Sequence, residues 1–299
     1  MPIRLDEHAS GEYSQHGEEG MIGAVFDAIG VTSRTCVEFG AYDLQRSSNV
    51  YSLWNSGWRA LLIEGDHDQF AKVSAQYSAL PLSVQRQVEI VNRFVAESGE
   101  NSLDSILSEH GFPTDLDLLV IDVDGLDFHI WRGLQRFRPR LVVVEYNATI
   151  PPHIEIVGAA SGNHIGASAL AVSRLGADKG YSLIGCIGWN AFFVEREHAS
   201  LFADADDLEA LFDYSHIRYA MQSYRGEVFL SAPPLVPFYI GQKKAVGWPL
   251  FRYDSDEIEQ SSVPLGKNRN TAPGIAETVI RHYLRPLKTL GRRARARQA

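Results

Sequence analysis

Three aspartates follow a short apolar run near the middle of the chain. The run Leu118–Ile121 is followed by Asp122, Asp124 and Asp127, with Gly125 between them. Four consecutive apolar residues are typical of a strand buried on both faces of a parallel sheet, and open α/β sheets bind ligands at the carboxyl ends of such strands. One carboxylate is enough to cap the next helix, and we predict that role for Asp127. Asp122 and Asp124 are therefore candidate catalytic residues, and Asp122 is also a candidate ligand of a cofactor or a metal.

Three further predicted strands also end in polar groups or glycine. These groups are Glu38 with Gly40, Glu64, and Glu145 with Asn147. In a parallel sheet all of them would lie at one edge. Gly40 has no side chain, so a ligand can approach the backbone of the first strand–helix turn. Glu64 could accept hydrogen bonds from both hydroxyls of a ribose, as in nucleotide cofactor sites, or could be a solvated strand end.

The first strand–helix turn lacks the glycines of a phosphate-binding loop. A dinucleotide site uses Gly-x-Gly-x-x-Gly, whereas the sequence here is Gly40-Ala-Tyr-Asp-Leu-Gln. The chain also has no Gly-x-x-x-x-Gly-Lys loop. The pattern therefore indicates a cofactor that has a ribose but no phosphate at this turn, and S-adenosylmethionine meets that description.

Strands and helices alternate through the first half of the chain. Short apolar runs predict five strands, at 35–40, 59–65, 88–92, 118–121 and 141–147. This alternation is typical of a right-handed, doubly wound and mainly parallel α/β sheet. Residues 181–185 and 191–195 are predicted to form an antiparallel hairpin that completes the sheet.

The connecting segments carry recognisable helix signals. We predict that Ser14 caps the first helix and that Asn101 caps the helix before the fourth strand. Three later segments are predicted as a loop over the carboxyl edge, a helix and an acidic helix, at 153–164, 165–179 and 204–212. No regular period is found in 230–275, which we interpret as irregular.

The chain divides into three predicted parts. Residues 1–34 form an N-terminal helical segment, 35–200 a cofactor-binding domain, and 201–299 an irregular C-terminal extension. Within that extension, Ile275–Leu290 has nearly helical spacing of apolar residues. This helix could bind a partner, a second copy of the chain or anionic lipid; the favoured interpretation is that it packs on the body and ends in a basic tail.

Composition bounds the class of protein. The chain has 299 residues, of which 45% are hydrophobic and 22% charged, as in ordinary globular proteins. No apolar run approaches the roughly 20 residues that cross a membrane, and the N-terminus has no apolar secretory segment. Cys36 and Cys186 lie in apolar runs, which predicts buried free thiols and favours the cytoplasm.

The charge is unevenly distributed. The formal net charge is −9, yet the residues from Arg281 onward include seven basic residues and no acidic one. The body of the chain is therefore strongly acidic. Because nucleic acids bind to basic surfaces, this distribution argues against nucleic acid as a partner of the body.

Several short motifs together resemble a known family. They are Ser14–Glu19, Val37–Asp43 with Ser48-Asn49, Gly57-Trp58, Leu62–Glu64, Ile121–Gly125, Val144–Asn147, Gly166–Ser168, Lys179–Tyr181 and Asn190–Phe193. Their order and spacing resemble the FkbM-type S-adenosylmethionine-dependent methyltransferases over roughly residues 13–195. The resemblance implies a class I methyltransferase-like Rossmann fold.

The same resemblance implies roles for individual residues. The family pattern implies that Glu38, Gly40 and Asn49 line the methionine end of the cofactor, Glu64 holds the ribose, Asn92 contacts the adenine, and Asp122 faces the methionine amine or the reaction centre. Tyr42 and Asp43 depart from the more glycine-rich loop of many methyltransferases. We include Tyr42 among the predicted cofactor-binding residues.

A second resemblance concerns a metal. Metal-dependent catechol-type O-methyltransferases place one Asp after the fourth strand and an Asp-Asn pair after the fifth, and Asp122, Glu145 and Asn147 are similar to that arrangement. Oxygen ligands suit Mg²⁺ or Ca²⁺, and such an ion would lower the pKa of a substrate hydroxyl. The alternative is that Glu145 and Asn147 are only hydrogen-bonding groups at a strand end.

The functional hypotheses follow from these residues. The first is methylation of a hydroxyl on a sugar or another small polyol, with or without magnesium and with His153 or His164 as a candidate base. The second is a binding or assembly module that keeps the fold without turnover. The third is a nucleotide-dependent oxidoreductase, against which the missing glycines count.

Overall fold

The computed structural model of the chain describes residues 1–40, 43–161, 165–218, 220–222, 224, 228–230 and 258–261. They all belong to the unit formed by residues 1–235 and 257–263. The predicted helix at 275–290 and the basic tail lie outside the described residues, and the predicted boundaries at 34 and 200 stay predictions.

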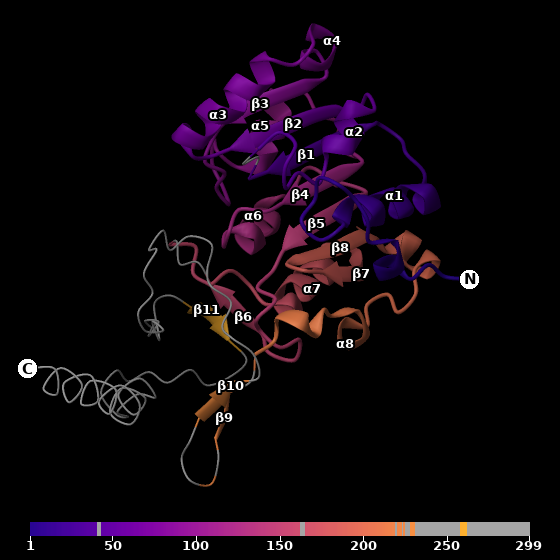
Figure 1. The fold of residues 1–299 in the computed structure, drawn as a ribbon, viewed down its shortest axis with the longest axis vertical. Helices are drawn as coiled ribbons and strands as arrows, with labels where there is room; N and C mark the ends of the chain where they lie inside the picture. The colour runs from indigo at the N-terminus through magenta and orange to yellow at the C-terminus, as the bar shows by residue number, and fades with distance from the viewer. Residues whose placement is uncertain are drawn as a thin grey trace, which may run out of the picture. The chain divides into compact units, whose positions relative to one another are not determined.

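A seven-stranded sheet forms the centre of this unit (Figure 1). Its order is β3-β2-β1-β4-β5-β8-β7. The strands are β1 (Thr35–Phe39), β2 (Arg59–Glu64), β3 (Val88–Asn92), β4 (Leu118–Ile121), β5 (Leu141–Glu145), β7 (Tyr181–Ile187) and β8 (Asn190–Glu195). The first five are parallel, and β8 is antiparallel to both of its neighbours. This order is that of a class I methyltransferase-like Rossmann sheet, so the predicted fold and hairpin are confirmed.

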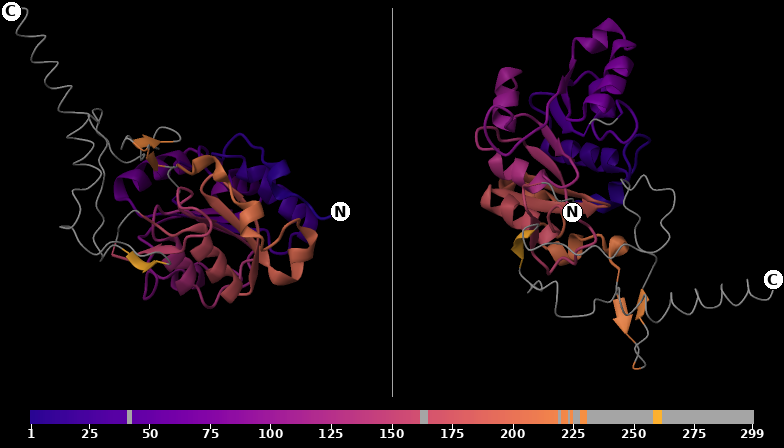
Figure 2. Two further views of the ribbon diagram at one scale, coloured as in Figure 1. Left: turned by 90° about the horizontal axis from the view of Figure 1, so that it is seen from below. Right: turned by 90° about the vertical axis from the view of Figure 1, so that its left-hand side faces the viewer.

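Helices cover both faces of the sheet, as Figure 2 shows. They are α1 (Glu18–Ile29), α2 (Tyr51–Asn55), α3 (His67–Ser78), α4 (Leu82–Gln85), α5 (Leu103–Glu109), α6 (Asp127–Gly133), α7 (Ala169–Asp178) and α8 (Leu208–Leu211), with the 3₁₀ turns η1 (Leu5–His8), η2 (Arg196–Leu201) and η3 (Tyr214–His216). Alternate strand residues supply two apolar layers. Val37 packs in the layer that contains Trp131 of α6, and Cys36 packs in the layer that contains Trp54 of α2.

The strand order reverses between β1 and β4. Both strands are parallel neighbours, with Val37 opposite Leu119, while the chain continues from β1 to β2 on one side and from β4 to β5 on the other. Open α/β sheets bind ligands at the carboxyl ends of the strands beside such a reversal. Because β8 runs antiparallel, the turn between β7 and β8 also lies at this carboxyl edge.

The opposite edge of β4 contains an acidic residue with a structural role. Asp117 is fully buried and accepts hydrogen bonds from the backbone N–H groups of Thr32, Ser33 and Arg34. Arg140 also lies 3.1 Å from its carboxylate. Burial would raise the pKa of Asp117, but the hydrogen bonds from Thr32, Arg140 and Arg34 outweigh it and the pKa lies below its usual value. This carboxylate therefore ties the start of β1 to β4 and β5.

Some predicted helix caps are wrong by one or a few residues. The N-cap of α1 is Gly17; Ser14 lies before it and its Oγ accepts from the backbone N–H of Glu19 at 3.3 Å. Ser102, rather than Asn101, caps α5 by accepting from the backbone of Ser105. An N-cap residue has an extended backbone, and its side-chain oxygen accepts a hydrogen bond from the first turn of the helix. The spacing of apolar residues does not determine which residue occupies this position.

Asp127 does not cap α6 as predicted. It is the first residue of the helix, and its carboxylate accepts from the backbone N–H groups of Val123 at 2.8 Å and Gly125 at 2.9 Å. The side chain therefore holds the turn that follows β4. Asp127 therefore stabilises the residues before the helix and does not cap the helix itself.

Two later segments differ from prediction. The predicted loop 153–164 contains a short strand, β6 (Ile156–Gly158), which pairs antiparallel with β11 (Ile258–Ser261). The partner strand β11 is about a hundred residues away along the chain. The strand β6 has only three residues, too few to show a detectable periodicity in the sequence. The predicted acidic helix at 204–212 is reduced to α8, and the predicted helix at 165–179 begins at Ala169 after the cap Ser168.

The two cysteines are buried and free, as predicted. A short hairpin, β9 (Ala220–Gln222) with β10 (Val228–Leu230), follows η3 along the chain. Among the helices that the structure describes, none has the length and hydropathy to span a membrane.

Candidate functional site

The end of β1 brings two of the predicted cofactor-binding residues against β4. Glu38 is buried; its carboxylate accepts from the Ser48 hydroxyl at 2.7 Å and from the Asn49 backbone N–H at 2.6 Å. Burial raises the pKa of Glu38 to about 7, although these hydrogen bonds oppose the shift. Gly40 has φ +67°, and a Cβ there would lie 2.2 Å from the backbone oxygen of Asp122. Only glycine fits this close approach.

The segment between Gly40 and α2 contains two more predicted cofactor-binding residues. Tyr42 lies outside the described residues. Asn49 is buried, with 4% of its surface exposed, and follows Ser48 in the segment that leads to α2. The structure therefore places Asn49 against Glu38 at the end of β1, two residues before Gly40, and their role in cofactor binding stays a prediction.

Glu64 and Asn92 lie side by side at the ends of β2 and β3. They are opposite each other in the parallel register, and the Asn92 side-chain amide donates to the backbone oxygen of Glu64 at 2.8 Å. One carboxylate oxygen of Glu64 accepts from the Asp66 backbone N–H at 2.7 Å. Burial raises the pKa of Glu64. Glu64 is thus one strand away from the turn at Gly40, and Asn92 is two strands away.

A group of four carboxylates surrounds the end of β4. Asp122, Asp124 and Asp127 follow the strand, and Glu145 ends β5 beside them, with the Asp124 backbone N–H donating to Glu145 at 3.0 Å. We call this group the acidic cluster. Burial and the neighbouring carboxylates raise the pKa values of Asp122 and Glu145, and burial raises that of Asp127 to about 6. A bound cation would offset this concentration of negative charge.

One of the three predicted metal ligands, Asn147, is hydrogen-bonded to residues that follow it in the chain. The Asn147 side-chain amide donates to the backbone oxygen of Ile165 at 2.9 Å, and its oxygen accepts from the Thr149 backbone N–H at 3.0 Å. The Asn147 side chain therefore stabilises the backbone that follows β5 through these hydrogen bonds. Within the described ranges, the single group of three Asp, Glu, His or Cys residues whose candidate ligand atoms lie within 4.8 Å of one another is Glu195, Glu197 and His198, beyond the opposite end of β8.

The predicted catalytic residues differ in position. Asp122 and Asp124 lie in the acidic cluster at the carboxyl edge, where Asp122 is half-buried and Asp124 is exposed. His153 lies on the loop after β5 with its side chain exposed, and His164 lies outside the described residues. The structure thus brings the two aspartates to the predicted edge and leaves His153 at the surface.

Several residues at the same edge were missed by sequence reasoning. Glu18, in the first turn of α1, is 1% exposed and accepts from the Asn190 side chain at 3.0 Å and from the His16 backbone N–H at 2.8 Å. Its charge contributes to the raised pKa values of Glu38 and Asp122, so it belongs to the same electrostatic environment. An acidic residue in a first helical turn is ordinary, and no signal in the sequence marks Glu18 as buried.

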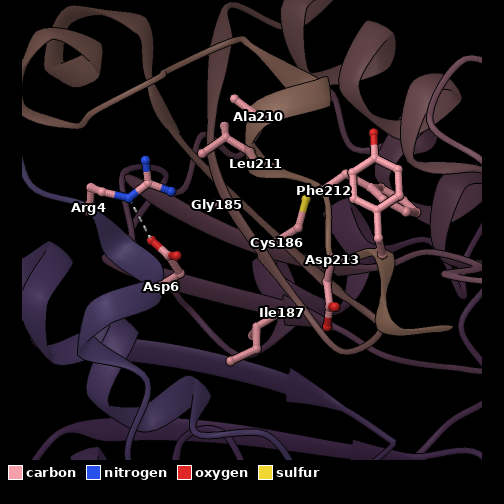
Figure 3. A pocket seen from close by; sticks show the side chains of 10 residues that line it. Arg4, Asp6, Gly185, Cys186, Ile187, Ala210, Leu211, Phe212 and Asp213 are labelled. Carbon is pink, nitrogen blue, oxygen red and sulfur yellow. Dashed lines mark ion pairs between the residues drawn. The ribbon is translucent and has the colours of Figure 1, made fainter. Parts of the chain in front are cut away.

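A cavity of about 330 Å³ lies elsewhere on this unit (Figure 3). It is lined by residues of η1, β7 and the segment 210–214, among them Arg4 and Asp6, whose charged groups are 3.4 Å apart. Asp213 and Cys186 also line it, but none of the predicted site residues does. The predicted cofactor site at the carboxyl edge is therefore a different place.

Comparisons with solved structures found distant matches. They include the glycopeptide N-methyltransferase MtfA, at 12% identity over 61% of this chain and 91% of that chain with a TM-score of 0.36. The methyltransferase domain of a bacterial CtHen1 matches at 12% identity over 59% and 96%, with a TM-score of 0.40. The CcbJ methyltransferase from Streptomyces caelestis matches at 11% identity over 60% and 95%, with a TM-score of 0.36. The fold assignment itself rests on the strand order.

The sequence comparisons are more specific. No curated protein matches the chain. Residues 38–181 match the family model of the methyltransferase FkbM domain, a range that begins at the buried Glu38 and ends at the start of β7. The range contains Glu64, Asn92 and the whole acidic cluster. Residues 38–181 of this chain are therefore similar to the methyltransferase FkbM domain.

Proposed function

We propose that this protein is an S-adenosylmethionine-dependent methyltransferase that methylates a hydroxyl of a sugar or another small polyol. The observation that carries the proposal is the position of Glu64, a buried carboxylate at the end of β2, one strand from the turn at Gly40. A ribose bound over this edge of the sheet would meet that carboxylate. The FkbM match supports the same class of reaction.

The residues at the carboxyl edge fit this cofactor. A carboxylate accepts up to about four hydrogen bonds, so Glu64 can hold ribose hydroxyls while it also accepts from the Asp66 backbone. Gly40 allows the end of β1 to lie against the backbone of Asp122, and the Asn92 amide donates to the backbone oxygen of Glu64. The acidic cluster would stabilise the positive charges of the ammonium and sulfonium groups. When bound, S-adenosylmethionine supplies a methyl group on a positively charged sulfur.

The acceptor hydroxyl must lose a proton, and the acidic cluster offers bases. A carboxylate whose pKa is raised is a stronger base than an ordinary one, which supports Asp122 as the catalytic group. Asp124 is exposed beside it and remains a predicted catalytic residue, and His153 remains an alternative base. The cytoplasm remains the predicted compartment.

Titration with S-adenosylhomocysteine by calorimetry tests the first half of the proposal. We expect binding in the micromolar range, a common range for cofactors. Transfer of a radiolabelled methyl group to a panel of sugars and polyols tests the second half. Binding without transfer to any acceptor would favour a non-catalytic module, and the absence of binding would reject the proposal.

The Glu64→Gln variant should bind the cofactor more weakly. The substitution keeps the shape of the side chain but replaces charge-assisted hydrogen bonds to the ribose with neutral ones, and we expect the dissociation constant of S-adenosylhomocysteine to rise about tenfold. Calorimetry measures this change. The matched control is Glu197→Gln, which removes a charge from a side chain that is 76% exposed beyond the opposite end of β8. Equal affinities of the two variants would contradict the role of Glu64.

Magnesium assistance is the alternative mechanism, and it can be tested directly. Because Asn147 is hydrogen-bonded within its own loop, we expect EDTA to leave both cofactor binding and methyl transfer unchanged. The measurement compares the transfer rate with EDTA and with added MgCl₂. A rate that falls with EDTA and returns with MgCl₂ would establish the metal-dependent alternative with Asp122 and Glu145 as ligands.

A further inference from the structure

Three aromatic rings from distant parts of the chain meet at the carboxyl edge. They belong to His16, before α1, to Trp189, in the turn between β7 and β8, and to His216, at the end of η3. The centroids of Trp189 and His216 are 5.0 Å apart, and those of His16 and His216 are 6.1 Å apart with the rings nearly perpendicular. We call these three side chains the ring cluster. His16 is exposed, and the other two are half-buried.

The backbone around the ring cluster is held by several hydrogen bonds. The Asp213 carboxylate accepts from the backbone N–H of Gly188 at 3.2 Å and from that of Ser215 at 2.9 Å, which joins the β7–β8 turn to η3. The backbone oxygen of Trp189 accepts a hydrogen bond at 2.7 Å from the backbone N–H of Tyr146, the residue directly after β5. The ring cluster is therefore positioned by the sheet itself.

Close packing adds to this order. Gly188 has φ +53°, and a Cβ there would lie 2.2 Å from a ring carbon of His16. Only glycine therefore allows the imidazole of His16 to lie against the turn. The backbone of His16 is also held, because its N–H donates to the buried Glu18.

The ring cluster is next to the acidic cluster. Asn190 follows Trp189 and is opposite Glu145 in the register of β5 and β8. Glu145 in turn accepts from the backbone of Asp124. A molecule that lies over Trp189 is therefore beside the carboxylates that we assign to the cofactor and the reaction.

One buried polar atom at this place has no partner among the residues that the structure describes. Asn190 is 5% exposed, and its side-chain nitrogen donates to Glu18, but its side-chain oxygen accepts no hydrogen bond within the described part of the chain. A buried acceptor of this kind costs stability unless a donor reaches it.

We propose that the ring cluster is the acceptor subsite and that it binds the ring of a neutral sugar. The indole of Trp189 would stack on the apolar face of the sugar, while the imidazoles of His16 and His216 would hydrogen-bond its hydroxyls. This inference rests on the proposed function, because it supplies the acceptor site that the methyl transfer requires.

The lowered pKa of His216 favours the neutral imidazole, which suits a neutral ligand. Burial lowers its pKa, Asp213 opposes that shift, and His16 and Arg218 add to it. A neutral imidazole has one donor and one acceptor, which suits a hydroxyl. Its Nδ1 lies 3.0 Å from the Ser215 hydroxyl, so Nε2 is the nitrogen that would meet the sugar.

Saturation-transfer NMR on the full chain with S-adenosylhomocysteine tests this subsite. The probes are methyl glycosides of neutral hexoses, 6-deoxyhexoses and pentoses, together with myo-inositol and one methyl glucuronide. We expect saturation at the ring protons of at least one neutral probe. In Trp189→Ala the affinity for that probe should fall about tenfold, and in His216→Gln about threefold to tenfold.

Matched controls separate the subsite from the fold and from the cofactor. Trp58→Phe changes a buried Trp at the amino end of β2, and His198→Gln changes a histidine in η2; both should bind the probe as the wild type does. Calorimetry with S-adenosylhomocysteine should give the same affinity for all four variants, which shows that each is folded.

The outcomes distinguish the subsite from the proposed function. No saturation of any neutral probe, equal signals in Trp189→Ala and the wild type, or saturation of the glucuronide alone would overturn the neutral-sugar subsite. Sugar binding that depends on Trp189 in a chain that does not bind S-adenosylhomocysteine would keep the subsite and reject the proposed methyltransferase.

Discussion

Gly40→Ala is expected to disrupt the cofactor site and to destabilise the domain. A Cβ at this position would lie 2.2 Å from the backbone oxygen of Asp122, so the ends of β1 and β4 must separate. The residue also has φ +67°, which costs an L side chain about 1–2 kcal/mol. With the cost of the forced backbone shift, we expect the free energy of unfolding to fall by about 2–5 kcal/mol. Denaturant unfolding measures this change.

Gly40→Ala should weaken cofactor binding more than the unfavourable φ of residue 40 can explain by itself. We expect the dissociation constant of S-adenosylhomocysteine to rise by a factor on the order of a hundred, because the same shift moves both strand ends that hold it. The matched control is Gly57→Ala, since Gly57 has φ +96° but a Cβ there would have no other atom within 4 Å. If Gly57→Ala weakens binding as much as Gly40→Ala, the close approach to Asp122 is not the cause.

Glu145→Gln is expected to stabilise the protein above neutral pH. Burial, Asp122 and Asp127 raise the pKa of Glu145, so the ionised carboxylate is less favourable in the folded chain than in the unfolded one. A glutamine keeps the oxygen that accepts from the Asp124 backbone and removes the charge. We expect the free energy of unfolding to rise by about 1–3 kcal/mol near pH 8, while methyl transfer falls.

The pH dependence of this gain has a definite sign. A group whose pKa is raised on folding stabilises the fold below its unfolded pKa, about 4.3 for Glu, and loses that contribution as the pH rises through the folded pKa. The variant and the wild type should therefore be equally stable near about pH 4 and diverge as the pH increases. Urea unfolding at a series of pH values measures the difference.

Glu97→Gln provides a control of opposite sign. The hydrogen bond from Arg132, with an N–O distance of 2.7 Å, lowers the pKa of Glu97. The ionised Glu97 therefore stabilises the fold above its unfolded pKa, and its replacement should destabilise the protein at neutral pH. If Glu145→Gln also destabilises the protein there, the acidic cluster does not carry the unfavourable charge that we infer.

These two predictions describe one property of the carboxyl edge. The raised pKa values of Asp122 and Glu145 lead us to expect that the ionised acidic cluster lowers the stability of the fold. Proteins retain such arrangements where the charge is used, because a bound cation then recovers the lost free energy. Binding of the positively charged S-adenosylmethionine should therefore stabilise the protein more at pH 8 than at about pH 5.

The central part of the fold could be predicted from sequence because its signals are local. Each parallel strand is a short apolar run, such as Leu118–Ile121, and helices lie between successive parallel strands along the chain. The polar ends of those runs then had to share one edge, since parallel strands point the same way. This reasoning placed Glu38, Gly40, Glu64 and Asp122 correctly relative to the sheet.

Prediction failed where a partner lies far along the chain. The strand β6 exists because β11 pairs with it, and the loop prediction for 153–164 had no local sign of that partner. The hydrogen bond from the Asn147 amide to the backbone oxygen of Ile165 likewise joins residues 18 positions apart and could not be predicted from local spacing. Tertiary contacts that span many residues leave no periodicity to detect.

The sequence alone determined the parallel sheet and the FkbM resemblance and placed the polar strand ends at one edge, because backbone periodicity and strand direction are set by neighbouring residues. Only the tertiary structure decided what each polar group does there. Asp117 and Asp122 flank the same strand, yet one is satisfied by backbone N–H groups and the other lies among like charges. His16, Trp189 and His216 meet for the same reason: burial and packing, rather than spacing along the chain, decide which side chains share an environment.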